Sequence, residues 1–107
     1  MIAIGALRHR LVLEAPVETP DGAGGVAREH VAVATLWAAV TPVAARADVV
    51  ADAAGQTVTH RIVLRAGPEI GTRHRLRHGA RLYRVLTCRA LDATGRFIVV
   101  DAEEQRP

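Results

Sequence analysis

The residues most able to do chemistry lie in one basic run between positions 73 and 84, RHRLRHGARLYR. Its five arginines are Arg73, Arg75, Arg77, Arg81 and Arg84. Guanidinium groups bind phosphates and carboxylates, often through two parallel hydrogen bonds. We predict that this run is a basic patch used in assembly or placed near DNA, with a solvated face as the alternative. The run has a single aromatic residue, so it offers little material for base stacking.

Other reactive side chains do not form a catalytic set. His74 and His78 have no carboxylate close to them in the sequence, and the neighbouring arginines oppose a cation. Cys88 lies in an apolar segment, and we predict that it is a small, buried hydrophobic side chain. The chain has no Ser and no Lys, which excludes a serine nucleophile, a Schiff-base lysine and a P-loop lysine. We therefore expect no enzyme activity, no metal site and no cofactor.

Composition indicates one small domain spanning residues 1–107. Half of the 107 residues are hydrophobic, but only Trp, Tyr and Phe at one copy each are aromatic. The core should be thin, and neighbouring subunits could add to its stability. The net charge of +3 permits contact with nucleic acid or acidic proteins without establishing either. With no long apolar run and no signal-peptide pattern, we expect the protein to be made and assembled in a cytoplasm.

Alternation of apolar and polar residues predicts strands as the main elements. The predicted strands cover residues 7–14, 31–43, 57–65, 74–77, 81–88 and 96–100. Short strands with turn signals at this spacing are typical of a small barrel or sandwich. We predict a mainly β chain: a small β-barrel of about five to six strands with one long inter-strand loop or short helix.

Three segments fall outside the predicted strands. Residues 16–27 contain two prolines and the glycine-rich Asp21–Gly25, and they predict a long, mobile loop with a hairpin tip. Their glycine spacing fits neither of the common phosphate-binding patterns. The alanine-rich residues 44–56 could form a short helix or a loop that orders on a partner. The tail, residues 101–107, should be flexible or docked on a partner.

Trp37 is the largest apolar side chain in the sequence. It lies in the predicted strand 31–43, which is apolar on both faces. A strand of this kind can bury one face against a neighbouring element or subunit. We predict that Trp37 is an anchor, in the core in the favoured interpretation and at an interface in the alternative.

A series of segments, in order, resembles the phage head–tail joining family of small head-closure, or stopper, proteins. The segments are Gly5–Arg10, Asp21–Gly25, Leu36–Pro42, Ala54–Gln56, Val58–Arg65 and Gly79–Val85. The resemblance extends from about residue 5 to residue 103. Family members occur in long-tailed phages, in prophages and in gene transfer agents.

The resemblance implies a small β-barrel subunit of a ring, six-fold in that family, in the neck of the particle. Such a ring lies between the portal with its adaptor and the tail, closes the channel of packaged double-stranded DNA, and provides the tail attachment surface. Its partners are other copies of itself, the portal-adaptor ring and a tail terminator or tail tube protein. By position, the family's channel-facing loop corresponds here to a segment that contains Arg46, Asp48, Asp52 and Gln56.

Two other functions stay open at this stage. One is a tail-completion protein at the tail end of the same neck. The other is an OB-like nucleic-acid-binding barrel that would use the basic run as a track for phosphates.

Overall fold

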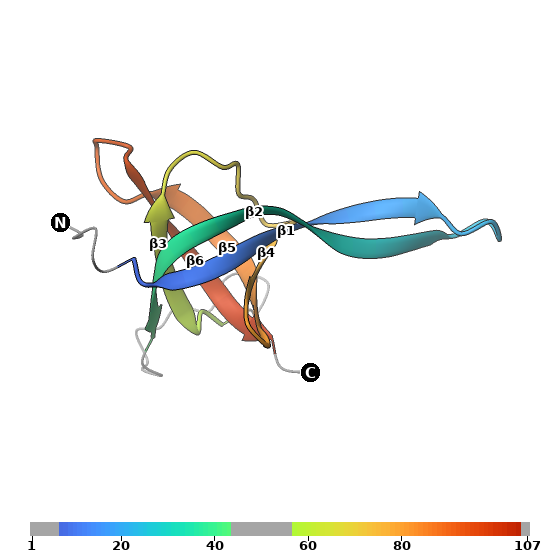
Figure 1. Cartoon of the computed structure of the whole chain (residues 1–107), viewed down its shortest axis with the longest axis horizontal. Helices are drawn as coiled ribbons and strands as arrows, with labels where there is room; N and C mark the ends of the chain where they lie inside the picture. The colour runs from blue at the N-terminus through green and yellow to red at the C-terminus, as the bar shows by residue number, and fades with distance from the viewer. Residues whose placement is uncertain (1–6, 44–56, 106–107) are drawn as a thin grey trace.

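The strands of this chain alternate between a barrel interior and its outer surface. The computed structural model describes residues 7–43 and 57–105. Within these ranges the elements are β1 (His9–Pro20), β2 (Val26–Pro42), β3 (His60–Arg65), β4 (Arg75–His78), β5 (Arg81–Ala90) and β6 (Phe97–Gln105). All neighbouring strands are antiparallel and form a closed barrel in the order β1-β2-β3-β6-β5-β4 (Figure 1). The predicted small β-barrel is therefore confirmed.

The core follows directly from this alternation. Its fully buried members are Leu11, Leu13, Ala38, Ile62, Leu64, Leu76, Tyr83, Val85, Val100 and Ala102. Burying each larger aliphatic side chain contributes roughly 1.5–3 kcal/mol. Tyr83 is the largest of them, and its ring packs edge-on against His60, with ring centroids 4.9 Å apart. One aromatic ring thus fills much of the centre of an otherwise aliphatic core.

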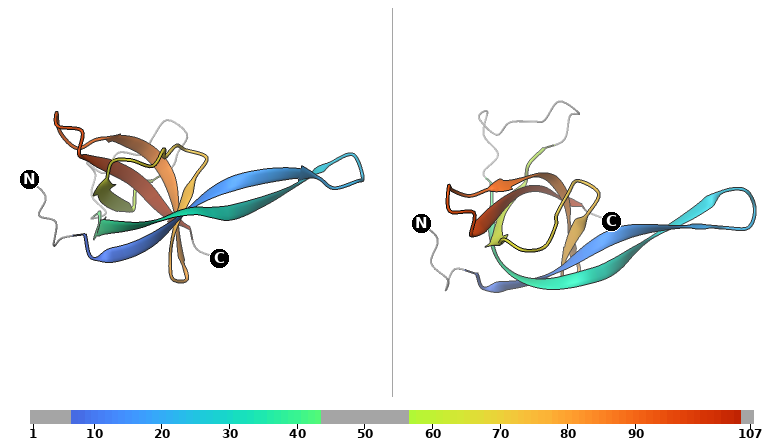
Figure 2. Two further views of the ribbon diagram at one scale, coloured as in Figure 1. Left: turned by 45° about the horizontal axis from the view of Figure 1, so that its top comes forward. Right: turned by 90° about the horizontal axis from the view of Figure 1, so that it is seen from above.

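The first two strands are much longer than the barrel requires. Residues 15–31, here called the arm, continue past the barrel as a two-stranded ribbon and project to one side (Figures 1 and 2). At the tip, Oδ1 of Asp21 accepts hydrogen bonds from the backbone N–H groups of Ala23 and Gly25. Gly22 and Gly24 have positive φ angles, 81° and 86°, which explains why the turn uses glycine.

The arm corrects the predicted loop at residues 16–27. Pro16 pairs with His30 and Pro20 with Val26, so the ladder continues to the end of β1. A proline is tolerated in a strand that has an open edge, because its missing N–H then costs no ladder hydrogen bond. Only the tip, Asp21–Gly25, is a loop, as the glycines indicated.

Two further expectations change. Residues 101–105 of the predicted tail belong to β6, which pairs with β5 as far as Gln105. Cys88 is exposed rather than buried: although it pairs in register with the buried Val100, it lies in the last part of β5, where residues 87–90 are all exposed. The predicted helix or loop at residues 44–56 lies outside the described residues. Within the described ranges, no helix is long and apolar enough to cross a membrane.

Candidate functional site

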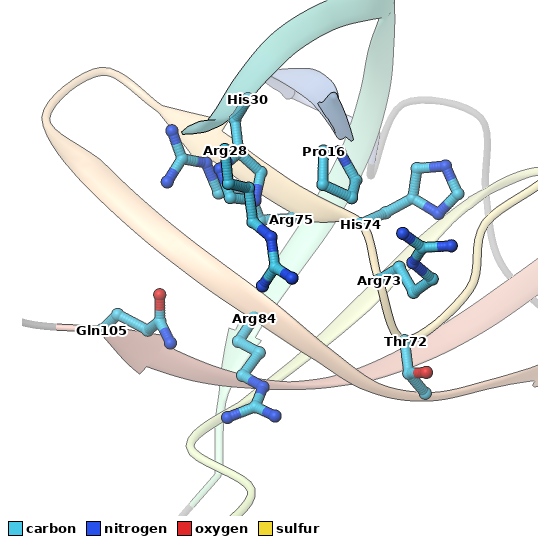
Figure 3. A pocket seen from close by; sticks show the side chains of 9 residues that line it. All are labelled: Pro16, Arg28, His30, Thr72, Arg73, His74, Arg75, Arg84 and Gln105. Carbon is cyan, nitrogen blue, oxygen red and sulfur yellow. The ribbon is translucent and has the colours of Figure 1, made fainter. Parts of the chain in front are cut away.

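A basic groove lies where the arm leaves the barrel. It has a volume of about 450 Å³. Its lining residues, called the basic groove from here on, are Pro16, Arg28, His30, Thr72, Arg73, His74, Arg75, Arg84 and Gln105 (Figure 3). None of these nine side chains is acidic, whereas four are arginines. The groove therefore has the chemistry of an anion-binding surface.

Strand alternation explains why the arginines meet on one surface. On β4, Leu76 points into the core opposite Tyr83, so Arg75 points outward. Arg75 pairs in register with Arg84 of β5, which is also on the outside of the barrel. Two like charges directly opposite each other disfavour pairing unless an anion lies nearby. The fold thus places two guanidinium groups side by side at the base of the groove.

Glu14 supplies one such anion from beneath the groove. Its carboxylate accepts a hydrogen bond from Nε of Arg75 at 2.6 Å and another from Nε of Arg77 at 3.0 Å. Burial alone would raise the pKa of Glu14, but the hydrogen bonds and charges of the two arginines outweigh it and lower the pKa. Glu14 is therefore ionised at neutral pH and holds Arg75 in place.

The arm contributes Arg28 and His30 to the opposite wall. Nη2 of Arg28 lies 2.6 Å from Oε1 of Glu18 across the ribbon, in an exposed ion pair. In Figure 3 the Arg28 side chain extends from β2 toward Arg84 on β5. Burial lowers the pKa of His30, and the nearby charge of Arg75 lowers it further. His30 is thus largely neutral at pH 7.

The loop before β4 forms the remaining wall. The backbone N–H of Gly71 donates to Nδ1 of His74 at 3.0 Å, so in the neutral ring the hydrogen is on Nε2. His74 can therefore donate a hydrogen bond without carrying a charge. Arg73 has no ion pair among residues 7–43 and 57–105. Its charge is available to a ligand.

The basic patch predicted from the sequence is only partly assembled in the groove. Arg73, Arg75 and Arg84 line it, whereas Arg77 bonds to Glu14 and Arg81 lies 3.5 Å from Glu104. Sequence reasoning missed Arg28 and His30, which are far away along the chain. The length of β2 brings them in: the strand starts at Val26 rather than at the predicted residue 31, and so includes both.

Trp37 is not a core residue. It is 56% exposed, and the guanidinium of Arg10 lies 5.8 Å from the centre of its ring. Its neighbours Leu36 and Ala38 pack on or in the core, so alternation turns Trp37 outward. The core interpretation is wrong, and the interface interpretation stays a prediction. The channel-side candidates Arg46, Asp48, Asp52 and Gln56 lie outside the described residues.

The histidines are dispersed over the described structure. His78 packs edge-on against His9, with ring centroids 5.0 Å apart, and His60 is buried beside Tyr83. In the part of the chain that the structure describes, no three His, Cys, Asp or Glu side chains gather as a metal site would require.

Comparison with known families decides where this barrel belongs. The family model for phage head completion proteins matches residues 2–105. The chain belongs to that family. A solved structure described as the virion of a native gene transfer agent particle contains a chain of 31% identity. The alignment covers 92% of this chain and 94% of that one, with a TM-score of 0.69.

A second similar structure is the solution structure of protein SF1141 from Shigella flexneri 2a. Its TM-score is 0.75 at 23% identity, and the alignment covers 96% of each chain, which shows the shared fold. No curated protein matched significantly. The resemblance predicted from the sequence is confirmed: this phage head completion protein is a structural component of the head or neck of a phage or phage-like particle.

Proposed function

We propose that this head completion protein forms a ring between the portal-adaptor and the tail, closes the DNA channel and provides the tail attachment surface. The family match supports a role in completing the head. The similar chain in a gene transfer agent virion supports a place in an assembled particle. Six-fold symmetry is carried over from the family resemblance. Assembly would take place in the host cytoplasm.

The observation that carries the ring proposal is the open edge of β2, in the arm and next to it, with its exposed apolar residues. A closed barrel has no free strand edges, but β3 pairs with β2 only from Ala38 to Pro42. Within the described chain, β2 from Val26 to Trp37 therefore has one open edge. Exposed valines and Trp37 lie along it: Val26, Val31, Val33 and Trp37 are 63%, 39%, 54% and 56% exposed. Subunits arranged head to tail around an axis would each cover the next one's arm.

The two edges of the arm differ in a way that favours β2 as the contact. β1 carries Pro16 and Pro20, which remove backbone donors and discourage pairing with a further strand. β2 has no proline before Pro42. A neighbouring subunit would thus meet the β2 side of the arm.

The channel-facing residues remain a proposal from the resemblance alone. Arg46, Asp48, Asp52 and Gln56 would face the channel by position in the family. The partners would be the portal-adaptor ring on one side and a tail terminator or tail tube protein on the other.

Electron microscopy of particles from a producer lacking this gene tests the proposal. We expect heads that have lost their DNA, beside free and fully formed tails. Expression of the wild-type chain in trans should restore tailed, DNA-filled particles, whereas Trp37→Ala should restore fewer. Intact tailed particles without the gene would remove the protein from head closure.

The same images separate the alternatives. Filled heads with incomplete tails would favour a tail-completion protein. The basic groove favours one further candidate, a free-standing nucleic-acid-binding barrel, which predicts normal particles in the deletion strain together with DNA binding by the purified protein.

A further inference from the structure

We propose that the basic groove binds the phosphodiester backbone of double-stranded DNA, through Arg28, Arg73, Arg75 and Arg84. This inference rests on the proposed function, which brings the protein next to packaged DNA. It assigns the contact to the barrel surface beneath the arm.

The geometry of the groove suits phosphate. Its arginines come from separate parts of the chain: Arg28 from the arm, Arg73 from the loop before β4, Arg75 from the start of β4, and Arg84 from β5 (Figure 3). Arginine presents a planar fork of donors that matches phosphate oxygens. Thr72, Gln105 and Nε2 of His74 are neutral donors at the same surface. Charged and neutral donors together are what a phosphodiester requires.

Existing ion pairs do not neutralise the groove. Glu18 forms an ion pair with Arg28, and Glu14 forms ion pairs with both Arg75 and Arg77. Two carboxylates thus pair with three arginines. Arg73 adds a charge with no ion pair in the described part of the chain. An exposed pair such as Arg28 with Glu18 is weak and can exchange its partner for a phosphate.

The lining favours DNA over an acidic protein segment. Protein interfaces are anchored by apolar and aromatic side chains in fitted pockets. The only apolar lining residue is Pro16, and none of the nine lining residues is an aromatic Phe, Tyr or Trp. The exposed apolar side chains of β2, among them Val33 and Trp37, are not part of this lining. A groove without anchors or stacking residues fits sequence-independent contact with a sugar–phosphate backbone.

Glu14 acts here as a positioning residue. It holds Arg75 from beneath, at 2.6 Å, and does not line the groove. Because Glu14 also joins β1 to β4, changes at Arg75 would mix binding with folding. The test therefore changes Arg73 and Arg84 and leaves the ion pair intact.

Fluorescence anisotropy with the full-length protein and a labelled 30-base-pair duplex of random sequence provides the test. The affinity is measured across a salt series for wild type, for Arg73→Gln with Arg84→Gln, and for Arg65→Gln with Arg96→Gln. The control pair removes the same charge from the other end of the barrel, where Arg65 pairs with Phe97 at the start of β6. Thermal unfolding of all three proteins checks that they are folded.

For the variant with Arg73→Gln and Arg84→Gln, the groove variant, we expect the negative slope of log K against log salt to become shallower by about 2. Its affinity for DNA at low salt should fall roughly tenfold. The control variant should stay near wild type. Equal losses in the two variants, or no loss in either, would overturn the proposal. So would displacement of DNA from wild type by poly-glutamate at an equal concentration of charges, which would indicate an acidic protein partner instead.

The two proposals fail separately. If the gene deletion releases DNA from heads but the groove variant binds DNA as wild type does, the groove assignment is wrong and head closure stands. If the groove variant loses DNA binding but deletion leaves tailed particles intact, the groove assignment stands and the ring proposal is wrong.

Discussion

The carboxylate of Glu14 and the guanidinium of Arg75 are hydrogen-bonded at 2.6 Å, and this contact joins the first strand of the barrel to the fourth. The β1–β4 pairing that closes the barrel is short: it comprises Val12 with Arg77, Leu13 with Leu76 and Glu14 with Arg75. Leu13 and Leu76 meet on the inside, while Glu14 binds both arginines on the outside. The β1–β4 pairing is therefore stabilised by an apolar contact on its inner face and by ion pairs on its outer face.

Replacing Glu14 by Gln should destabilise the protein by about 1.5–3 kcal/mol. The variant keeps the volume of the side chain but removes the charge that two arginine donors share, and hydrogen bonds to charged groups are worth this much. Urea unfolding followed by circular dichroism measures the change. Glu18→Gln is the matched control, and it should cost less than about 0.5 kcal/mol because its pair with Arg28 is exposed. Equal costs for the two variants would contradict the role given to Glu14.

Acid should weaken the fold through Glu14 and Asp101. Burial would raise the pKa of Asp101, but hydrogen bonds from Arg89, Thr87 and Arg61 outweigh it and lower the pKa, as happens at Glu14. Both groups bind protons more weakly when folded, so their contribution is present at neutral pH. It is lost as the pH falls below the ordinary pKa values of 4.5 for a glutamate and 3.8 for an aspartate and reaches the lower pKa values of the folded state. Unfolding free energies measured from pH 7 to pH 3 should decline in this window, and the decline should be shallower in Glu14→Gln.

A second acid-dependent loss should begin at higher pH. Burial lowers the pKa of His60 below 6.5, and burial with the charge of Arg75 does the same for His30. The folded state prefers both rings neutral, so stability is complete above pH 6.5 and decreases as the pH falls from there. Unfolding measured between pH 7 and pH 5 should show this slope in wild type. The double variant His30→Gln with His60→Gln should be nearly flat, and an unchanged slope would show that other groups are responsible.

Trp37→Ala should impair assembly more than folding. Because the side chain is 56% exposed, truncation removes the contact with Arg10 and only part of the apolar burial of a core residue, a change of about 1–2 kcal/mol. Urea unfolding gives this value, and sedimentation of assembled rings or particle rescue gives the effect on assembly. Leu76→Ala is the comparison for a true core position and should cost about 2–5 kcal/mol. A cost of that size for Trp37→Ala would contradict its exposed position.

Gly79→Ala should destabilise the turn between β4 and β5. Gly79 has φ +61°, and an added Cβ would meet nothing within 4 Å, so the cost of about 1 kcal/mol comes from backbone conformation alone. Thermal unfolding measures it. Gly71→Ala is the control, because Gly71 lacks a positive φ and its added Cβ would lie 3.9 Å from His74. That variant should be neutral or slightly stabilising.

The strand pattern was readable from the sequence wherever one face is buried. In β3, His60, Ile62 and Leu64 point inward while Arg61 and Arg65 point outward, as alternation predicted. In the arm the sequence does not alternate between apolar and polar residues in this way, because neither face of the ribbon is covered within the described chain. Pro16 and Pro20 then suggested a loop, although the ladder passes through both. The same limit misplaced Trp37, since β2 is apolar on both faces and composition alone does not say which face meets the core.

The sequence by itself determined the fold class, the family and the density of arginine between positions 73 and 84, because these depend on local pattern and residue order. Only the tertiary structure decided which arginines lie together. The β4–β5 hairpin places Arg75 beside Arg84, and the long β1–β2 ribbon with the β1–β4 pairing brings Arg28 and His30 to them. The pairing of β1 with β4, which are distant in the chain, sets the neighbours that the hairpin does not. A shift of one residue would turn every side chain of β4 to the other face.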